Sequence, residues 1–273
     1  MNMKPVLGSQ IQLGHPLARG LVGCWLFNEG SGNIVHDASG NGGDGTATSY
    51  VWRSGSDGRE IAEVASGSEF GIDTPVGYYP LNNAAACTVH MTVTPDSILD
   101  DGGLFYTNEH ALTANSAVCL WLDNSTSDHV AVIVYGSGGN TGVDYSAYVP
   151  VAGTTFTVTL TWNGTTTRLY INGIEDTAGD FPGTGATGTL DGDASVYHFG
   201  NDTGGGKELD GGIRNAALWT RALTAQEVAS LYADPYGMFR SRHLPLWVGA
   251  TSVGGAPPAA TGYMTLNTGF WGP

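Results

Sequence analysis

The sequence has few charged residues, and positive charge is the scarcer sign. Charged side chains make up 13% of the 273 residues, about half the usual share. Ten lysines and arginines stand against 25 aspartates and glutamates, which leaves a net charge of −15. A chain this acidic repels phosphate backbones and anionic lipid, so we expect no nucleic-acid partner and no membrane insertion.

Long hydrophobic runs and a secretory signal are also missing. The sequence has no stretch of 18 apolar residues, the length that would cross a membrane as a helix. Residues 1–5 lack the apolar core of a signal peptide. Either the mature form has lost a signal peptide, or the protein leaves the cell by another route such as cell lysis, as for a virus particle.

Cysteine is scarce, and its spacing suggests no metal site. The three cysteines are Cys24, Cys87 and Cys119, and each lies in an apolar run. Free, buried thiols are the prediction. A Cys87–Cys119 disulfide is the alternative.

The dominant pattern is an alternation of period two. In Thr155–Trp162, threonine alternates with large apolar residues, which predicts a strand with one face in the core and one in solvent. Asn163–Gly164 then predicts a type I′ hairpin turn, with φ positive at both residues. Thr167–Ile171 is the next strand, and Asn172–Gly173 is a second turn of the same kind.

Many similar short runs, separated by Gly, Asp and Ser, indicate an antiparallel sandwich or barrel. No helical crossovers separate the runs, which argues against a parallel sheet. The further predicted strands are residues 21–27, 87–94, 103–106, 116–122, 129–135, 143–149, 195–200 and 212–219.

One helix is predicted near the end of this pattern. Thr224 and Glu227 have the spacing of a capping box, and Asp234–Pro235 ends the helix. The expected buried face consists of Ala225, Val228, Ala229 and Tyr232.

The two ends of the chain lack the regular alternation of its middle. We predict an N-terminal arm over 1–19, one sandwich domain over 20–235 and a C-terminal extension over 236–273. Residues 257–273 contain no charged residue. The expected partner-docking residues of this tail are Tyr263, Phe270 and Trp271, against a second copy or another protein. The alternative is a tail folded onto its own domain.

Several motifs, in the right order, resemble the laminin-G-like (concanavalin A-like) jelly-roll domains. Gly20–Gly32 (GLVGCWLFNEGSG) and the loop from Asp37 (DASGNGGDG) resemble that family's first strand and the loop after it. Arg168–Gly173 (RLYING) resembles a strand and turn of the family, and Leu218–Thr224 (LWTRALT) resembles its closing segment. The resemblance implies an all-β, antiparallel jelly-roll β-sandwich with one short C-terminal helix and extended arms.

Two flanking segments resemble a narrower group. His15–Leu21 (HPLARGL) and Asp234–Arg240 (DPYGMFR) are similar to segments of laminin-G-like proteins of tailed bacteriophages. Those proteins tend to be structural parts of the particle, on the head surface or in tail fibres. The resemblance implies a virion location and contacts with other virion proteins and with copies of this chain.

The loop from Asp37 also has the start of a calcium-binding pattern. Oxygen side chains at alternate positions with Gly in sixth place resemble the first half of an EF-hand loop. Asp37, Asn41 and Asp44 are the candidate ligands of a structural calcium ion, the one cofactor predicted. Relatives often add acidic residues near the last strand, where this chain has Arg214 and Asn215. The alternative is an Asx turn that binds only backbone.

The sequence predicts glycan binding without catalysis. No strand alternates acids onto one face, and neither Glu29 with Asp37 nor Glu175 with Asp176 has a glycosidase pattern. Tyr78 and Tyr79 lie in an expected loop and are the candidate residues for stacking on a sugar. Most of the tryptophans, Trp25, Trp121, Trp162 and Trp219 among them, fall on predicted strands and are expected in the core.

Taken together, these patterns favour a non-enzymatic bacteriophage virion protein that contacts neighbouring subunits and, through its loops, host glycans. The alternative is a carbohydrate-binding module of a secreted bacterial protein.

Overall fold

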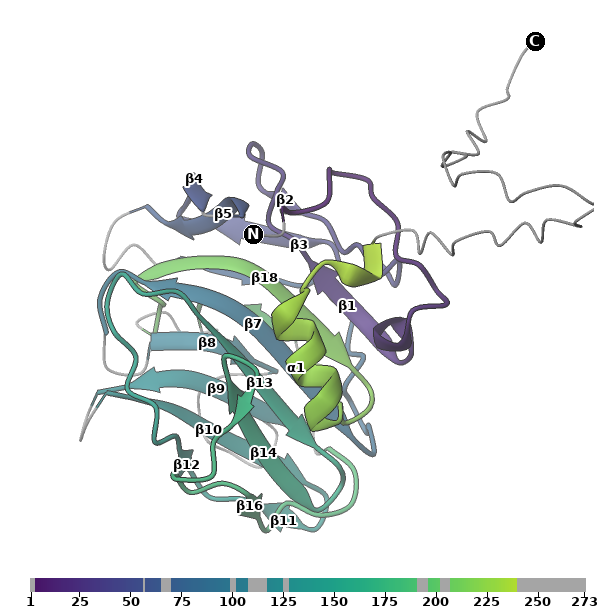
Figure 1. Ribbon diagram of the computed structural model, residues 1–273, viewed down its shortest axis with the longest axis vertical. Coiled ribbons are helices and arrows are strands. Elements are labelled where there is room, and N and C mark those ends of the chain that lie inside the picture. Colours follow the sequence, from purple (N-terminus) through teal and green to yellow (C-terminus); the bar gives the residue numbers. More distant parts are fainter. Residues whose placement is uncertain are drawn as a thin grey trace, which may run out of the picture. The chain divides into compact units, whose positions relative to one another are not determined.

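The computed structural model describes residues 3–55, 57–64, 70–98, 102–107, 117–124, 128–190, 196–201 and 207–239. The chain divides into two units, residues 1–240 and 241–273, and the described residues belong to the first. Its described residues form two antiparallel sheets, with one short α-helix on the outside (Figure 1). The predicted all-β sandwich is confirmed.

The first sheet joins strands that are far apart in the sequence. Its order is β15-β14-β13-β7-β18-β5-β4, with β1 also paired to β18 and β16 to β14. Its strands are β1 (Leu21–Trp25), β4 (Tyr50–Gly55), β5 (Gly58–Glu63), β7 (Cys87–Pro95), β13 (Phe156–Trp162), β14 (Thr166–Ile171), β15 (Ile174–Glu175), β16 (Gly183–Thr184) and β18 (Gly211–Trp219).

The second sheet has the order β11-β10-β9-β8-β17-β6-β3-β2, with β12 also paired to β10. Its strands are β2 (Ile34–Val35), β3 (Gly45–Thr48), β6 (Gly71–Asp73), β8 (Gly102–Tyr106), β9 (Val118–Asp123), β10 (His129–Gly136), β11 (Gly139–Asn140), β12 (Asp144–Tyr145) and β17 (His198–Phe199). The helical segments are η1 (Pro16–Ala18), α1 (Ala225–Ala233) and η2 (Gly237–Phe239).

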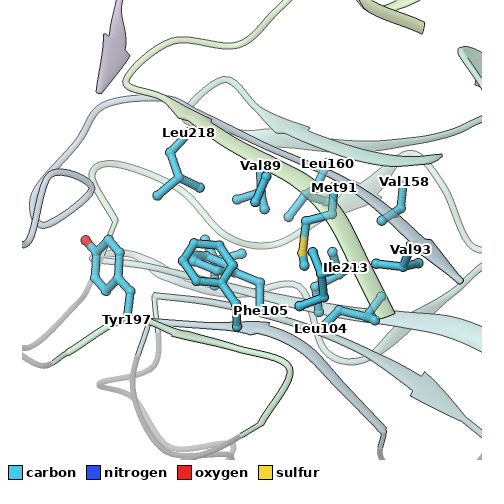
Figure 2. Close-up of a cluster of buried hydrophobic side chains, with 14 of the residues drawn as sticks. Val89, Met91, Val93, Leu104, Phe105, Val158, Leu160, Tyr197, Ile213 and Leu218 are labelled. Atoms are coloured by element: carbon cyan, nitrogen blue, oxygen red, sulfur yellow. The ribbon is translucent and has the colours of Figure 1, made fainter. Parts of the chain in front are cut away.

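The main core lies between the two sheets. Val89, Met91 and Val93 of β7 project from the first sheet toward Leu104 and Phe105 of β8 (Figure 2). All five are fully buried. Apolar residues at every second position of β7 therefore supply one wall of the core, as the alternation predicts.

The other face of the first sheet is buried as well, contrary to the expectation for Thr155–Trp162. Thr159 and Thr161 are 2% and 3% exposed. On the neighbouring strand, Thr88 donates to the carbonyl of Arg221 at 2.7 Å and accepts from the N–H of Leu223 at 2.9 Å. The segment that leads into α1 covers this face, so the Thr88 hydroxyl binds backbone groups of that segment in place of water. Thr159 Oγ1 likewise lies 2.8 Å from His90 Nδ1.

The predicted tryptophan core and free thiols are confirmed. Trp25, Trp121, Trp162 and Trp219 are at most 2% exposed. The three cysteines are free and buried, so the alternative disulfide does not form.

One of the two predicted type I′ turns is wrong. Asn172 and Gly173 have φ values of 51° and 78°, as that turn requires. In the earlier loop, Gly164 has a φ of 94°, whereas Asn163 is not among the residues with positive φ. The side chain of Asn163 instead accepts a hydrogen bond from the N–H of Thr166 at 2.9 Å, which closes a wider loop.

The sequence patterns missed the strands between β1 and β7. The hairpin of β4 and β5 has a polar sequence, YVWRSG and GREIAE, with no apolar alternation. Its buried Glu60 pairs with arginines beside the buried Ile61 and Ala62, so burial here mixes ionic and apolar residues and leaves no regular alternation. The predicted strand over 143–149 shrinks to β12, and that over 195–200 to β17.

Helix α1 has the predicted start but a different buried face. Thr224 caps it, and both contacts of the capping box with Glu227 are present. Val228 and Leu231 are the buried residues, whereas Tyr232 is 48% exposed. The helix lies across the outer face of the first sheet (Figure 1). There Val228 and Leu231 belong to one apolar cluster with Trp219.

The described part of the N-terminal arm packs on its own domain. Trp219 Nε1 donates to the carbonyl of Leu17 at 2.7 Å, and the N–H of Gln12 donates to the carbonyl of Met238 at 2.8 Å. Leu17 and Met238 belong to the same apolar cluster as α1. Residues on both sides of the predicted 20–235 domain therefore contribute to its packing.

Candidate functional site

The loop from Asp37 to Asp44, called the Asp37 loop below, carries the three predicted calcium ligands. Asp37 Oδ1 accepts hydrogen bonds from the N–H groups of Cys24 and Ser39, both at 2.9 Å. Its Oδ2 accepts from Ser39 Oγ at 2.7 Å and from the N–H of Gly43 at 3.1 Å. The residue is 9% exposed. Each carboxylate oxygen thus has two donors from its own chain, as in an Asx turn closed across the loop.

The other two candidate ligands point to different partners. Asn41 Nδ2 donates to the carbonyl of Val22 at 3.2 Å. Asp44 accepts from the N–H of Asp37 at 2.8 Å, and its other oxygen lies 3.1 Å from His36 Nδ1. Among the residues described, no three His, Cys, Asp or Glu side chains are grouped to hold a metal ion. Calcium binding by this loop stays a prediction.

Tyr78, predicted to be exposed for sugar stacking, is buried beneath the Asp37 loop. It is 8% exposed, and its hydroxyl donates to the carbonyl of Val22. Its ring meets Trp25 edge-on with ring centres 6.2 Å apart, and Trp25 Nε1 donates to the carbonyl of Gly43 at 2.7 Å. A Cβ at Gly43 would lie 2.5 Å from the Tyr78 ring, so glycine allows the loop to rest on it. The expected exposure is wrong because the ring supports the loop.

Burial raises the pKa of Tyr78 above its ordinary value, and the Asp37 carboxylate adds to the shift. The phenol therefore stays protonated and keeps its hydrogen bond. Tyr79 is half-buried and stays a predicted sugar contact.

A pocket of about 390 Å³ opens beside the Asp37 loop, between that loop and the N-terminal arm. Val6 and Leu7 of the arm, 78% and 57% exposed, contribute apolar surface. The volume lies in the range of small-molecule sites, roughly 300–1,000 Å³. This arm pocket is lined by Val6, Leu7, Gly8, Ser9, Leu26, Asn28, Glu29, His36, Asp37, Ala38 and Gly40.

Glu29 is the acidic residue of the arm pocket with spare hydrogen-bonding capacity. Its Oε1 accepts from the N–H of His36 at 2.8 Å, whereas its Oε2 is buried with no partner in the described part of the chain. The His36 side chain is 51% exposed. The pocket thus combines an apolar wall with an acid and an imidazole, groups that suit the faces and hydroxyls of a sugar.

The acids considered as glycosidase pairs have structural partners. Asp37 lines the arm pocket with Glu29, but its carboxylate already accepts four hydrogen bonds. Glu175 pairs with Arg168 on the adjacent strand, and Asp176 accepts from the N–H of Ala147 at 2.7 Å. In these positions the carboxylates hold loops and strands together.

No sequence pattern marks the arm pocket, because its two walls are separated by about twenty residues and meet only in the folded chain. The predicted docking residues Tyr263, Phe270 and Trp271 lie outside the described residues. No helix in the described part of the chain is long and apolar enough to cross a membrane.

Comparison with protein families agrees with the fold. Residues 66–229 match the laminin-G-type model described as the concanavalin A-like lectin/glucanase superfamily. The match spans more than half of the chain, and the chain belongs to this family. No curated protein matches the sequence.

Solved structures with a similar fold include domain 4 of AbnA, a GH43 extracellular arabinanase from Geobacillus stearothermophilus, in complex with arabinotriose. Its TM-score is 0.56 at 18% identity, over 78% of this chain and 98% of that one. Trypanosoma rangeli sialidase has a TM-score of 0.59 at 18% identity, over 81% of this chain and 33% of that one. The binding domain of Paraclostridial Mosquitocidal Protein 1 has a TM-score of 0.58 at 17% identity, and the match covers 81% of this chain and 53% of that one. At these identities the likeness concerns the fold, and this chain spans a third of the sialidase.

Proposed function

We propose that this chain is a non-catalytic, glycan-binding sandwich domain whose ligand site is the arm pocket. The observation that carries the proposal is the pocket itself, in a family of lectins and glucanases. The half-exposed imidazole of His36 offers a polar contact for a sugar hydroxyl beside Glu29, and Leu26 and the arm offer apolar surface. The arabinotriose complex of a structurally similar domain supports a carbohydrate ligand.

The absence of catalysis is part of the proposal. A retaining glycosidase needs two carboxyl groups about 5–5.5 Å apart, one of them free to attack. The Asp37 carboxylate accepts hydrogen bonds on both oxygens, three of them from donors in its own loop. It is therefore a poor nucleophile or base, which leaves Glu29 without a partner acid in this pocket.

Filling the arm pocket is expected to abolish glycan binding without unfolding the domain. Ala38 lines the pocket and is half-buried, so an Ala38→Trp side chain occupies its volume. We expect a loss of at least about tenfold in affinity for the glycans that the wild-type chain retains on an array, because contact surface and acceptor are both covered. Binding is measured by calorimetry with those glycans.

The matched control is Ala152→Trp, at an exposed position away from the pocket. It adds the same side chain and should bind as the wild type does. Equal affinity in both variants contradicts the assignment of the pocket. Turnover of a bound glycan that Glu29→Gln abolishes contradicts the absence of catalysis.

As the biological setting we propose a bacteriophage virion, with the chain as a head-decoration, fibre or tail component that contacts copies of itself and other virion proteins. The observations that favour it are the flanking segments similar to phage proteins and the uncharged, aromatic end of the sequence. The alternative setting is extracellular, as a carbohydrate-binding module of a secreted bacterial protein.

Deleting residues 257–273 is expected to leave a folded domain that no longer joins its assembly. Burial of Phe270 and Trp271 against a partner would contribute about 1.5–3 kcal/mol each. Cosedimentation with particles measures incorporation, and the melting temperature (Tm) measures folding. A full-length variant with Tyr263, Phe270 and Trp271 replaced by serine controls for length and should fail in the same way. A truncated chain that is incorporated as well as the full chain contradicts this prediction.

A further inference from the structure

The ammonium group of Lys4 is enclosed by backbone carbonyl oxygens. Its Nζ donates to the carbonyls of Leu26 at 2.7 Å and Arg214 at 2.6 Å, and also to that of Arg59. The carbonyl of Phe27 lies at 3.4 Å. These four oxygens, named the carbonyl cage, come from the two residues that follow β1, from β5 and from β18.

Charge around the carbonyl cage favours a cation. The carboxylates of Asp57, Glu60 and Glu29 all favour the charged form of Lys4, whereas Arg214 opposes it. Burial nevertheless lowers the pKa of Lys4 to about 8, because the ammonium has lost most of its water. Carbonyl oxygens have thus replaced a hydration shell, which is how rings of backbone carbonyls bind potassium.

The backbone beside Lys4 is held independently of the Lys4 side chain. The N–H of Lys4 donates to the carbonyl of Asp57 at 3.0 Å, and Asn28 Nδ2 donates to the carbonyl of Pro5 at 2.7 Å. The cage oxygens belong to strands and strand ends of the sandwich. Shortening the side chain therefore leaves the oxygens in place around an opening.

We propose that the carbonyl cage is a site for a monovalent cation of ammonium or potassium size, which this chain fills with its own Lys4. The lysine supplies the charge that the carbonyls and the three carboxylates require, and it fastens the N-terminal arm at the same time. Because the arm forms a wall of the arm pocket, the occupied cage also positions Val6–Ser9. Calcium fits less well, since its usual ligands include carboxylates at about 2.3–2.6 Å, whereas the four cage oxygens are neutral backbone carbonyls around an ammonium group.

The test compares two substitutions of Lys4 in the full chain. Lys4→Ala empties the cage, whereas Lys4→Met fills it with an uncharged chain of similar length. Potassium chloride should raise the Tm of Lys4→Ala by about 3–5 °C at ten times its Kd, relative to choline chloride at equal ionic strength. Lys4→Met and the wild type should show no such difference. Lys207→Ala, at the only other lysine, controls for the lost charge.

A crystal of Lys4→Ala soaked in rubidium should show an anomalous peak among the four carbonyls. If Lys4→Ala does not fold in any salt, the Tm of Lys4→Ser is measured in the same salts instead. The proposal is overturned if neither variant responds to potassium, if Lys4→Met responds equally, or if calcium stabilises the variants and potassium does not.

Discussion

Replacing Glu60 with leucine is expected to lower the free energy of unfolding by about 3–5 kcal/mol, as measured by urea denaturation. Glu60 is 3% exposed and accepts from Arg53 Nε at 2.5 Å and from Arg214 Nε at 2.8 Å. The Arg214 side chain is itself only 12% exposed. Without the carboxylate, the buried Arg214 guanidinium loses its close counter-charge where little water can replace it, and this sets most of the cost. Arg53 is 30% exposed and keeps its ion pair with Asp96, so it contributes less.

Glu175→Leu is the matched control for that variant. Glu175 also pairs with an arginine across adjacent strands, but the Arg168 side chain is 44% exposed. An exposed pair contributes about 0–1 kcal/mol, so this variant should remain close to wild type. Similar losses in both variants would contradict the view that burial of the Glu60 network determines its effect.

Replacing Asp37 with alanine is expected to lower the free energy of unfolding by about 2–6 kcal/mol, since two buried N–H groups lose their acceptor at about 1–3 kcal/mol each. Those groups belong to Cys24 and Gly43, and their hydrogen bonds hold the Asp37 loop on Trp25 and Tyr78. Thermal and urea unfolding measure the loss. Asp44→Ala removes a carboxylate that is 52% exposed and should cost about 1 kcal/mol.

EDTA separates the two interpretations of the Asp37 loop. If the carboxylate acts only through backbone N–H groups, EDTA leaves the Tm of the wild type unchanged and Asp37→Ala is equally destabilised with or without calcium. If the loop holds calcium, EDTA lowers the Tm and added calcium restores it by mass action on the folded state. The four hydrogen bonds to Asp37 lead us to expect the first result.

The fold was predictable where hydrophobic alternation and turn residues agree. Strands β7 and β13 have apolar residues at every second position, and these two strands and β14, which ends at the Asn172–Gly173 turn, were each expected within one or two residues of their bounds. The hairpin of β4 and β5 was missed, because its buried Glu60 is held by ion pairs with Arg53 of the same hairpin and with the distant Arg214. Local pattern identifies strands that bury hydrocarbon, but not strands that bury charge.

The candidate site was predictable only in part for a similar reason. The Asp37 loop was singled out from its glycines and oxygen side chains, and it does border the arm pocket. Tyr78 was expected in solvent, since nothing near it in sequence indicates that the Asp37 loop covers its ring. The contribution of the arm was missed, because Lys4 meets Arg214 across 210 positions of the chain.

By itself, then, the sequence determined the all-β class, the main central strands, the capped helix, the buried tryptophans and the free cysteines. These follow from local periodicity and from side-chain chemistry that depends little on distant residues. Only the tertiary structure decided which face of α1 is buried, that threonines line a covered face, that Asp37 is saturated with donors, and that Lys4 occupies a carbonyl cage. The covered threonines and the Lys4 cage depend on residues tens to hundreds of positions apart that meet with little water between them. The donors to Asp37 are at most 13 positions away, but the folded loop decides that they all reach one carboxylate. In such places the available partners decide which role a polar group has.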